Sequence, residues 1–198
     1  MEHGACASVI HDLYVDLSLS ENEIFSKMKK SVRNSIYQGE RLWETEVHSV
    51  VSNSLFDEFR LLHLEVAGRV TRSLESWNLQ KKAIDQGKGF LVTQRNESGL
   101  LIGAALFSVS RGEGSYDVAA FRRNLFDKPV SHVVQWKAIR YMKKLGLRWY
   151  FIGSRFYPGD LHVPTEKELH IAEFKEKFAT DMFPRLITDN DFRWCFRK

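Results

Sequence analysis

Residues 115–153 read SYDVAAFRRNLFDKPVSHVVQWKAIRYMKKLGLRWYFIG, and this stretch decides the fold. Ser115–Phe121 is short and rich in β-forming residues, 130–145 carries apolar residues at helical spacing, and Arg148–Ile152 is apolar and aromatic. Gly146 follows two lysines that suit the carboxyl end of a helix. The stretch therefore predicts a strand, a crossover helix and a second strand parallel to the first.

A basic turn, RRNLFDKP at 122–129, separates the first strand from the helix. Free backbone N–H groups at the helix start, together with Arg122 and Arg123, would suit an acidic or carbonyl-bearing ligand. An ordinary crossover whose arginines are only solvated fits the pattern equally well. The sequence leaves both interpretations open.

The segments on either side complete a mixed sheet with helices on both faces. Alternating or apolar runs predict strands at 13–17, 43–51, 89–95, 100–109, 184–187 and 192–196. Capping residues and helical spacing predict helices at 20–39, 54–67, 73–86 and 166–179. The 198 residues have no repeat and no linker, so we expect one domain over 1–198.

Composition sets the broad class. Hydrophobic residues make up 43% of the chain, enough for a full core, and 29 Lys and Arg against 25 Asp and Glu favour a phosphate-bearing partner without requiring one. Only Cys6 and Cys195 are present, which argues against a disulfide framework. The longest apolar run, 100–109, is too short to span a bilayer, and with no secretory signal in the first twenty residues we expect a cytoplasmic location.

Several known chemistries lack their motifs. The sequence has no GxSxG, GxxxxGK[ST] or GxGxxG, and its histidines lack HExxH or another tight ligand pairing, so no metal is predicted. His162 and His170 could meet in space, but isolated histidines are seldom ligands. His132 differs because it lies in the first turn of the central helix. There it could act as a base or bind a ligand, and a structural capping role is as good an explanation.

Two further patterns suggest binding residues. Lys29, Arg33 and Tyr37 share the face of the 20–39 helix opposite its apolar side, and such a face can hold a nucleotide or diphosphate. A solvated basic face is the commoner explanation. Lys175 lies on the apolar face of the 166–179 helix, where snorkelling or a salt bridge with Glu168 or Glu176 is the simplest account.

The order of these elements resembles the GNAT acyltransferase fold, and the motifs resemble its FemAB/FemX-type branch, the aminoacyl transferases of peptidoglycan bridge synthesis and their relatives. Four places carry the resemblance: Asp16–Ser18 with Lys29–Ile36, Ala67–Arg72, Tyr116–His132 with Gln135–Ile139, and Phe174–Lys175 with Phe178. The resemblance implies an α+β protein with three layers, α/β/α, around a mixed sheet. It also implies that the parallel strands splay apart where a ligand enters.

The resemblance assigns roles to residues as well. Arg33 and Tyr116 would help to hold a nucleotide-linked acceptor, and Phe174 and Lys175 would lie at the transfer site. Two departures matter. The classical enzymes have two GNAT-like halves and this chain matches only the second. In addition, 122–134 lacks the R/Q-x-x-G-x-G/A loop that binds the pyrophosphate of coenzyme A.

We therefore expect an N-acyltransferase that moves an acyl or aminoacyl group from an activated ester to an amine, in cell-envelope or surface-glycan synthesis. Lys175 would stabilise charge and His132 would handle the proton. No tightly bound cofactor is expected; aminoacyl-tRNA, acyl-CoA and acyl-carrier protein are the candidate donors, and a nucleotide-sugar-linked amine a candidate acceptor. The alternatives are a plain acyl-CoA-dependent enzyme and a non-catalytic half-domain that binds a nucleotide or RNA, either alone, as a homo-oligomer or with a partner chain.

Overall fold

The computed structural model describes residues 7–158, 160 and 163–188, and these form one mixed sheet of seven strands. The spatial order is β2–β3–β4–β5–β6–β1–β7. The strands are β1 (Ala7–Asp16), β2 (Glu44–His48), β3 (Gly89–Arg95), β4 (Leu101–Ser110), β5 (Glu113–Phe121), β6 (Trp149–Arg155) and β7 (Asp181–Thr188). Neighbouring strands are antiparallel except β5 and β6, which are parallel as predicted.

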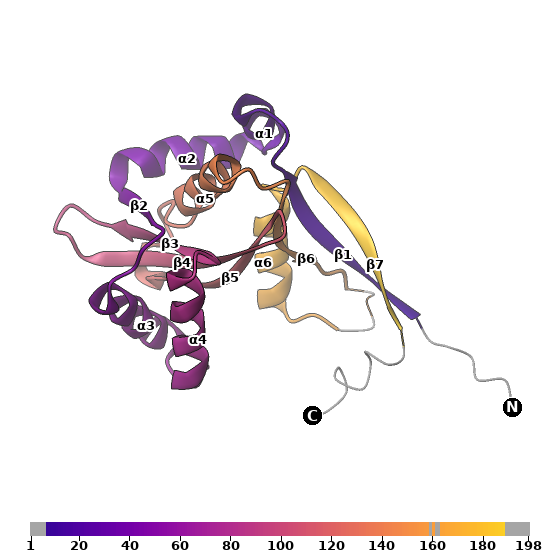
Figure 1. Ribbon diagram of the computed structural model, residues 1–198. Coiled ribbons are helices and arrows are strands. Elements are labelled where there is room, and N and C mark those ends of the chain that lie inside the picture. Colours follow the sequence, from indigo (N-terminus) through magenta and orange to yellow (C-terminus); the bar gives the residue numbers. More distant parts are fainter. Residues whose placement is uncertain (1–6, 159, 161–162, 189–198) are drawn as a thin grey trace, which may run out of the picture.

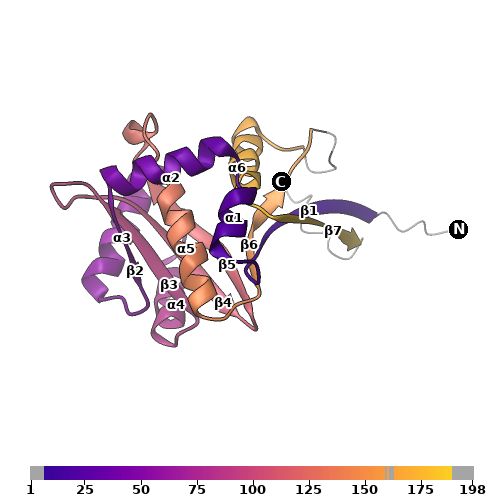
Figure 2. The ribbon, with the colours of Figure 1, turned by 90° about the horizontal axis from the view of Figure 1, so that it is seen from above.

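Helices cover both faces of the sheet, which gives the expected three layers (Figure 1). The helices α2 (Lys30–Leu42) and α5 (His132–Lys144) lie on one face, and α3 (Asn53–Ala67) and α4 (Leu74–Asp85) lie on the other. Figure 2 shows α5 crossing the sheet beneath α2. One buried cluster, which includes Phe107, Ile139 and Tyr150, fills the α5 side, and a second, which includes Phe59 and Trp77, fills the α3–α4 side.

The predicted helix over 20–39 is wrong, because the structure contains two helices there. α1 (Glu21–Lys27) begins at Ser20 with the expected capping box, but Met28 is extended, with φ −63° and ψ 147°. The Met28 side chain is buried, and the N–H of Lys29 donates to the carbonyl of Lys177. A tertiary contact therefore interrupts a segment whose local spacing favours a continuous helix.

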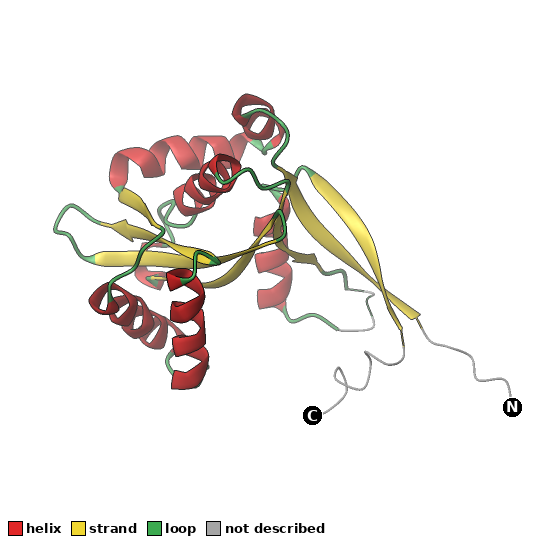
Figure 3. Ribbon diagram, viewed as in Figure 1, coloured by secondary structure: helices red, strands yellow, loops and turns green. Residues whose placement is uncertain are grey.

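Strand β1 is longer than predicted because its first half pairs with β7. The two strands extend as a ribbon from the rest of the molecule, as the secondary-structure colouring in Figure 3 makes clear. The predicted strand over 184–187 lies within β7. Its predicted hairpin partner, 192–196, lies outside the described residues.

The parallel strands splay apart, as predicted. Pairing between β5 and β6 is limited to Glu113 with Trp149, Gly114 with Tyr150 and Ser115 with Phe151. Beyond these pairs β5 continues to Phe121 and β6 to Arg155 without pairing to each other. Helix α6 (Glu166–Glu176) lies against β6, so its side chains have access to the opening between the two strands.

Candidate active site

Lys175, near the end of α6, extends into the opening between β5 and β6. Its ammonium lies 5.6 Å from the ring centroid of Tyr116 on β5, and it lies so close to Gly153 on β6 that a Cβ at that position would collide with it. Gly153 has φ 139°, a conformation that suits glycine. The Lys175 side chain therefore fits beside β6 because Gly153 has no side chain.

Of the two simple accounts of Lys175, snorkelling to the surface and a salt bridge within its own helix, the salt bridge does not form. Glu176 pairs with Arg155 at 2.9 Å, and Glu168 accepts hydrogen bonds from Thr165 in the capping box. Among the described residues no carboxylate lies within ion-pair distance of the Lys175 ammonium. Burial lowers the pKa of Lys175 because the protonated form loses hydration with no anion to replace it.

Tyr116 forms the wall of the opening opposite Gly153. Its ring packs against Phe107 with centroids 5.5 Å apart, and its hydroxyl interacts with Gln135 of α5. Burial raises the pKa of Tyr116, so the phenol stays protonated near neutral pH. The residue can therefore offer an aromatic face and an O–H group but not a base.

His132 begins α5 and lies beside α6. Its ring packs against Phe174 and Phe178, at centroid distances of 5.2 and 6.0 Å. Burial and the charge of Lys177 lower the pKa of His132 to about 4, which leaves the imidazole neutral near neutral pH. Its buried Nδ1 has no hydrogen-bond partner among the described residues. The structure thus brings His132 and Phe174 together, with Lys175 next in the chain.

The basic residues of α2 occupy a different environment. Arg33 donates hydrogen bonds to the carbonyls of Ser26 and Met28 and so joins α2 to α1. Tyr37 is 52% exposed and packs edge-on against Phe25, and the Lys29 side chain is exposed. The backbone N–H of Lys29 donates to the carbonyl of Lys177, which links this face to the end of α6. Whether these three residues bind an acceptor remains a prediction.

The structure shows the surroundings of the two arginines in the basic turn, and whether they face a ligand stays a prediction. Arg122 donates to the Leu101 carbonyl and pairs with Glu65 of α3 at 2.5 Å, while the Arg123 side chain is exposed. The turn folds into a short 3₁₀ helix, Arg123–Leu125, and the N–H groups of Leu125, Phe126, Lys128 and Val130 bond within the turn. These N–H groups of the turn are therefore not free for an anion, whereas anion binding by the N–H groups at the start of α5 stays a prediction.

The roles of two residues do not follow from the sequence alone. Gly153 directly follows the apolar stretch that predicts a strand, and in the structure its missing side chain makes room for Lys175. Gln135 is completely buried in α5 and accepts a hydrogen bond from Tyr150 at 2.5 Å. A polar residue amid the apolar positions Val133, Val134 and Trp136 was the available signal for Gln135. No sequence signal placed Gly153 opposite Lys175.

Within residues 7–158, 160 and 163–188, no three His, Cys, Asp or Glu side chains are grouped so that they could hold a metal ion. His162, one of the two histidines considered as a pair, lies outside the described residues. In the same part of the chain, no helix combines the length and apolar character needed to cross a membrane.

Comparisons with known proteins show a shared fold. Searches against family models and against curated protein sequences found no match. The crystal structure of FemX superposes with a TM-score of 0.71 at 11% identity, over 95% of this chain and 64% of that chain. The C-terminal domain of a putative lysylphosphatidylglycerol synthetase from Agrobacterium fabrum gives 0.68 at 16% identity, over 93% and 61%.

A smaller enzyme shares the fold as well. An aminoglycoside acetyltransferase from an uncultured soil metagenomic sample gives a TM-score of 0.53 at 10% identity, over 70% of this chain and 88% of that one. The chain thus has the GNAT-like α+β fold of FemX, which confirms the fold expected from the sequence. It spans a little over 60% of the two larger chains, and the identities establish the fold alone.

Proposed function

We propose that this chain is an N-acyltransferase whose transfer site is the opening between β5 and β6. The observation that carries the proposal is the position of Lys175, a largely buried cation without a carboxylate partner among the described residues, between Tyr116 and Gly153. A lysine in this environment is costly to stability and therefore calls for a function. Its setting suits stabilisation of negative charge on a reacting carbonyl oxygen.

The chemistry needs few groups. The acceptor amine attacks the carbonyl carbon of an activated ester or thioester, a C–N bond forms, and the C–O or C–S bond breaks. The ammonium of Lys175 stabilises the oxyanion of the tetrahedral intermediate, and the proton lost by the amine passes to a base on its way to the leaving group. We assign proton handling to His132, because it is neutral near neutral pH and lies against Phe174 beside the proposed site.

The donor we propose is an aminoacyl ester or an acyl thioester on a carrier. The sequence lacks the loop that ordinary GNAT enzymes use for the pyrophosphate of coenzyme A, and several N–H groups of the corresponding turn are bonded internally. The names of two proteins with this fold describe lysine joined to a phospholipid and acetylation of an aminoglycoside, both acyl transfers. A role in cell-envelope or surface-glycan synthesis is part of the proposal.

The test is a mass-spectrometric screen of amine acceptors, including nucleotide-sugar-linked amines, against aminoacyl-tRNA, acyl-carrier protein and acyl-CoA. We expect a product whose mass shows one new amide, formed with an aminoacyl or carrier donor and lost in Lys175→Met. Product with acyl-CoA alone would support a plain GNAT enzyme instead. The absence of product with every donor would contradict the proposal and favour a nucleotide- or RNA-binding module.

A further inference from the structure

A cavity far in sequence from the proposed transfer site lies between α3 and α4. It has a volume of about 300 Å³ and is formed by the last two turns of α3, the connector 68–72 and the first turn of α4. Its polar lining includes Arg60, Arg69, Arg72 and His63, while the ring of Trp77 packs against His63 with centroids 5.2 Å apart. We call it the α3–α4 cleft.

The charge of the α3–α4 cleft is positive. Its lining contains three arginines and no carboxylate. Arg60 has a partly exposed pairing with Asp57 at 3.3 Å, whereas Arg69 and Arg72 have no carboxylate within 4 Å in the part of the chain that the structure describes. Burial, followed by the charge of Arg72, lowers the pKa of His63. The cleft thus offers guanidinium groups suited to a phosphate.

The rim of the α3–α4 cleft is apolar and exposed. Four aliphatic side chains that line it remain 41–77% accessible to solvent: Leu61, Leu64, Val70 and Leu74. Exposed apolar residues interspersed with cations are typical of surfaces that enter the boundary between lipid headgroups and acyl chains. A free phosphate would use the arginines but would leave these apolar side chains in water.

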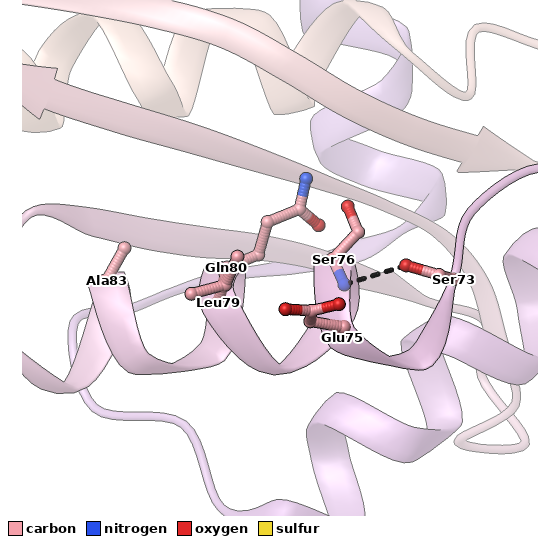
Figure 4. A pocket seen from close by; sticks show the side chains of 6 residues that line it. All are labelled: Ser73, Glu75, Ser76, Leu79, Gln80 and Ala83. Carbon is pink, nitrogen blue, oxygen red and sulfur yellow. Dashed lines mark hydrogen bonds between the residues drawn. The ribbon is translucent and has the colours of Figure 1, made fainter.

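The opposite side of α4 provides an internal comparison. There a neighbouring hollow is lined by Ser73, Glu75, Ser76, Leu79, Gln80 and Ala83, as Figure 4 shows. That hollow contains a carboxylate and no arginine, and its exposed Leu79 stands apart from the cleft. Leu79 therefore supplies a matched apolar control on the same helix.

We propose that the α3–α4 cleft binds the phosphate of an anionic phospholipid headgroup and docks the protein on a membrane surface. Arg69 and Arg72 contact the phosphate, and Val70 and Leu74 enter the interface beside them. This surface is separate from the acyl-transfer site, and the inference holds whether or not Lys175 is catalytic.

The test is co-sedimentation of the full chain with phosphatidylcholine vesicles, with and without phosphatidylglycerol. We expect binding only to the anionic vesicles. One basic residue near such a surface contributes roughly a factor of five, so Arg69→Ala with Arg72→Ala should weaken binding about 25-fold. The matched control, Lys30→Ala with Arg41→Ala, removes two exposed charges from α2 and should change binding less than about two-fold.

The apolar half of the proposal has its own test. Val70→Ser with Leu74→Ser changes two exposed positions without altering the charge, one of them at the start of α4 where serine is well tolerated, so the fold should persist. This pair should weaken vesicle binding strongly, whereas Leu79→Ser should leave most of it. Lys175→Met should bind vesicles normally, which separates this inference from the proposed function.

Three results would overturn the proposal. The first is no binding to anionic vesicles. The second is an equal loss in the α2 control, which would indicate non-specific attraction of charge. The third is binding of soluble glycerol phosphate, seen as an upward shift of the His63 pKa by NMR, together with unchanged vesicle binding in the Val70 and Leu74 variant. That outcome would identify the ligand as a soluble phosphate.

Discussion

The opening between β5 and β6 contains Lys175, expected to stabilise charge, and the basic face of α2 contains Arg33 and Lys29, expected to bind substrate. The environments of these cations differ. Lys175 is largely buried against Tyr116 and Gly153, without a carboxylate partner among the described residues. Arg33 is bonded to two backbone carbonyls at the α1–α2 junction, and Lys29 is exposed. The comparison teaches that a buried cation without a partner, which costs stability, indicates a function. A cation whose hydrogen bonds are already satisfied by the protein indicates a structural role.

The largest effect is expected from a substitution in the opening between β5 and β6. Lys175→Met keeps most of the side-chain volume and removes the charge, so kcat should fall about 10²–10³-fold, as when an oxyanion donor is removed. Because the ammonium is buried without an anion in the described residues, the free energy of unfolding should not fall and should rise near neutral pH. Steady-state kinetics and urea denaturation would measure the two quantities.

The matched control for Lys175 is Lys167→Met, which changes an exposed lysine in the first turn of the same helix. Its kcat should stay near that of the wild type. Normal turnover in Lys175→Met would contradict the proposed role of the lysine. The opening would then have no stronger evidence of function than the α2 face.

The lowered pKa of His132 predicts that the stability of the fold depends on pH. Its pKa is about 4 in the folded chain, against an ordinary value of 6.5, so the unfolded chain binds more protons between these two values. Stability therefore falls as the pH falls from 6.5, by about 3 kcal/mol at pH 4. His132→Phe, which fits between two aromatic rings, should remove this part of the acid loss in urea denaturation measured across the window.

His170, exposed on α6, is the control for the pH experiment. His170→Gln should retain the same fall in stability between pH 6.5 and 4. A His132→Phe variant with an undiminished fall would show that the imidazole is not buried as the structure places it.

Gly153→Ala tests the opening without changing any charge, because it only adds a methyl group. A Cβ at Gly153 would meet the Lys175 side chain, and the φ of 139° is unfavourable for alanine. The substitution should lower the free energy of unfolding by about 1–3 kcal/mol and reduce kcat by displacing the ammonium. Calorimetry and kinetics would measure both effects. The control is Gly99→Ala, because Gly99 also has a positive φ but has open space around it, so this variant separates backbone strain from the collision with Lys175.

The smallest effect concerns the α2 face. Arg33→Ala should lower stability by about 1 kcal/mol because it removes hydrogen bonds to the Ser26 and Met28 carbonyls, whereas Lys27→Ala should not. If the face binds an acceptor, Arg33→Ala and Lys29→Ala should both raise KM more than Lys27→Ala. Equal KM values for all three variants would show that the face is only solvated.

Much of the fold follows from local sequence, because caps and apolar periodicity act over a few residues. Ser20, Ser73 and Thr165 each accept the expected capping hydrogen bond, and β3 has the predicted bounds. The break at Met28 was not predictable in this way, because it depends on a contact with Lys177, far along the chain. The same holds for the first half of β1, which pairs with β7.

In the candidate site, too, some features follow from local sequence and others depend on contacts between distant segments. The sequence by itself nominated Lys175 and His132 as candidate catalytic residues, and it determined the parallel order of β5 and β6, because these depend on residue type and on the crossover helix. Only the tertiary structure decided that Lys175 meets Gly153 and Tyr116 while Arg122 pairs with Glu65. Burial and partners arise between segments distant in the chain, and it is burial that sets the cost of an unpaired charge.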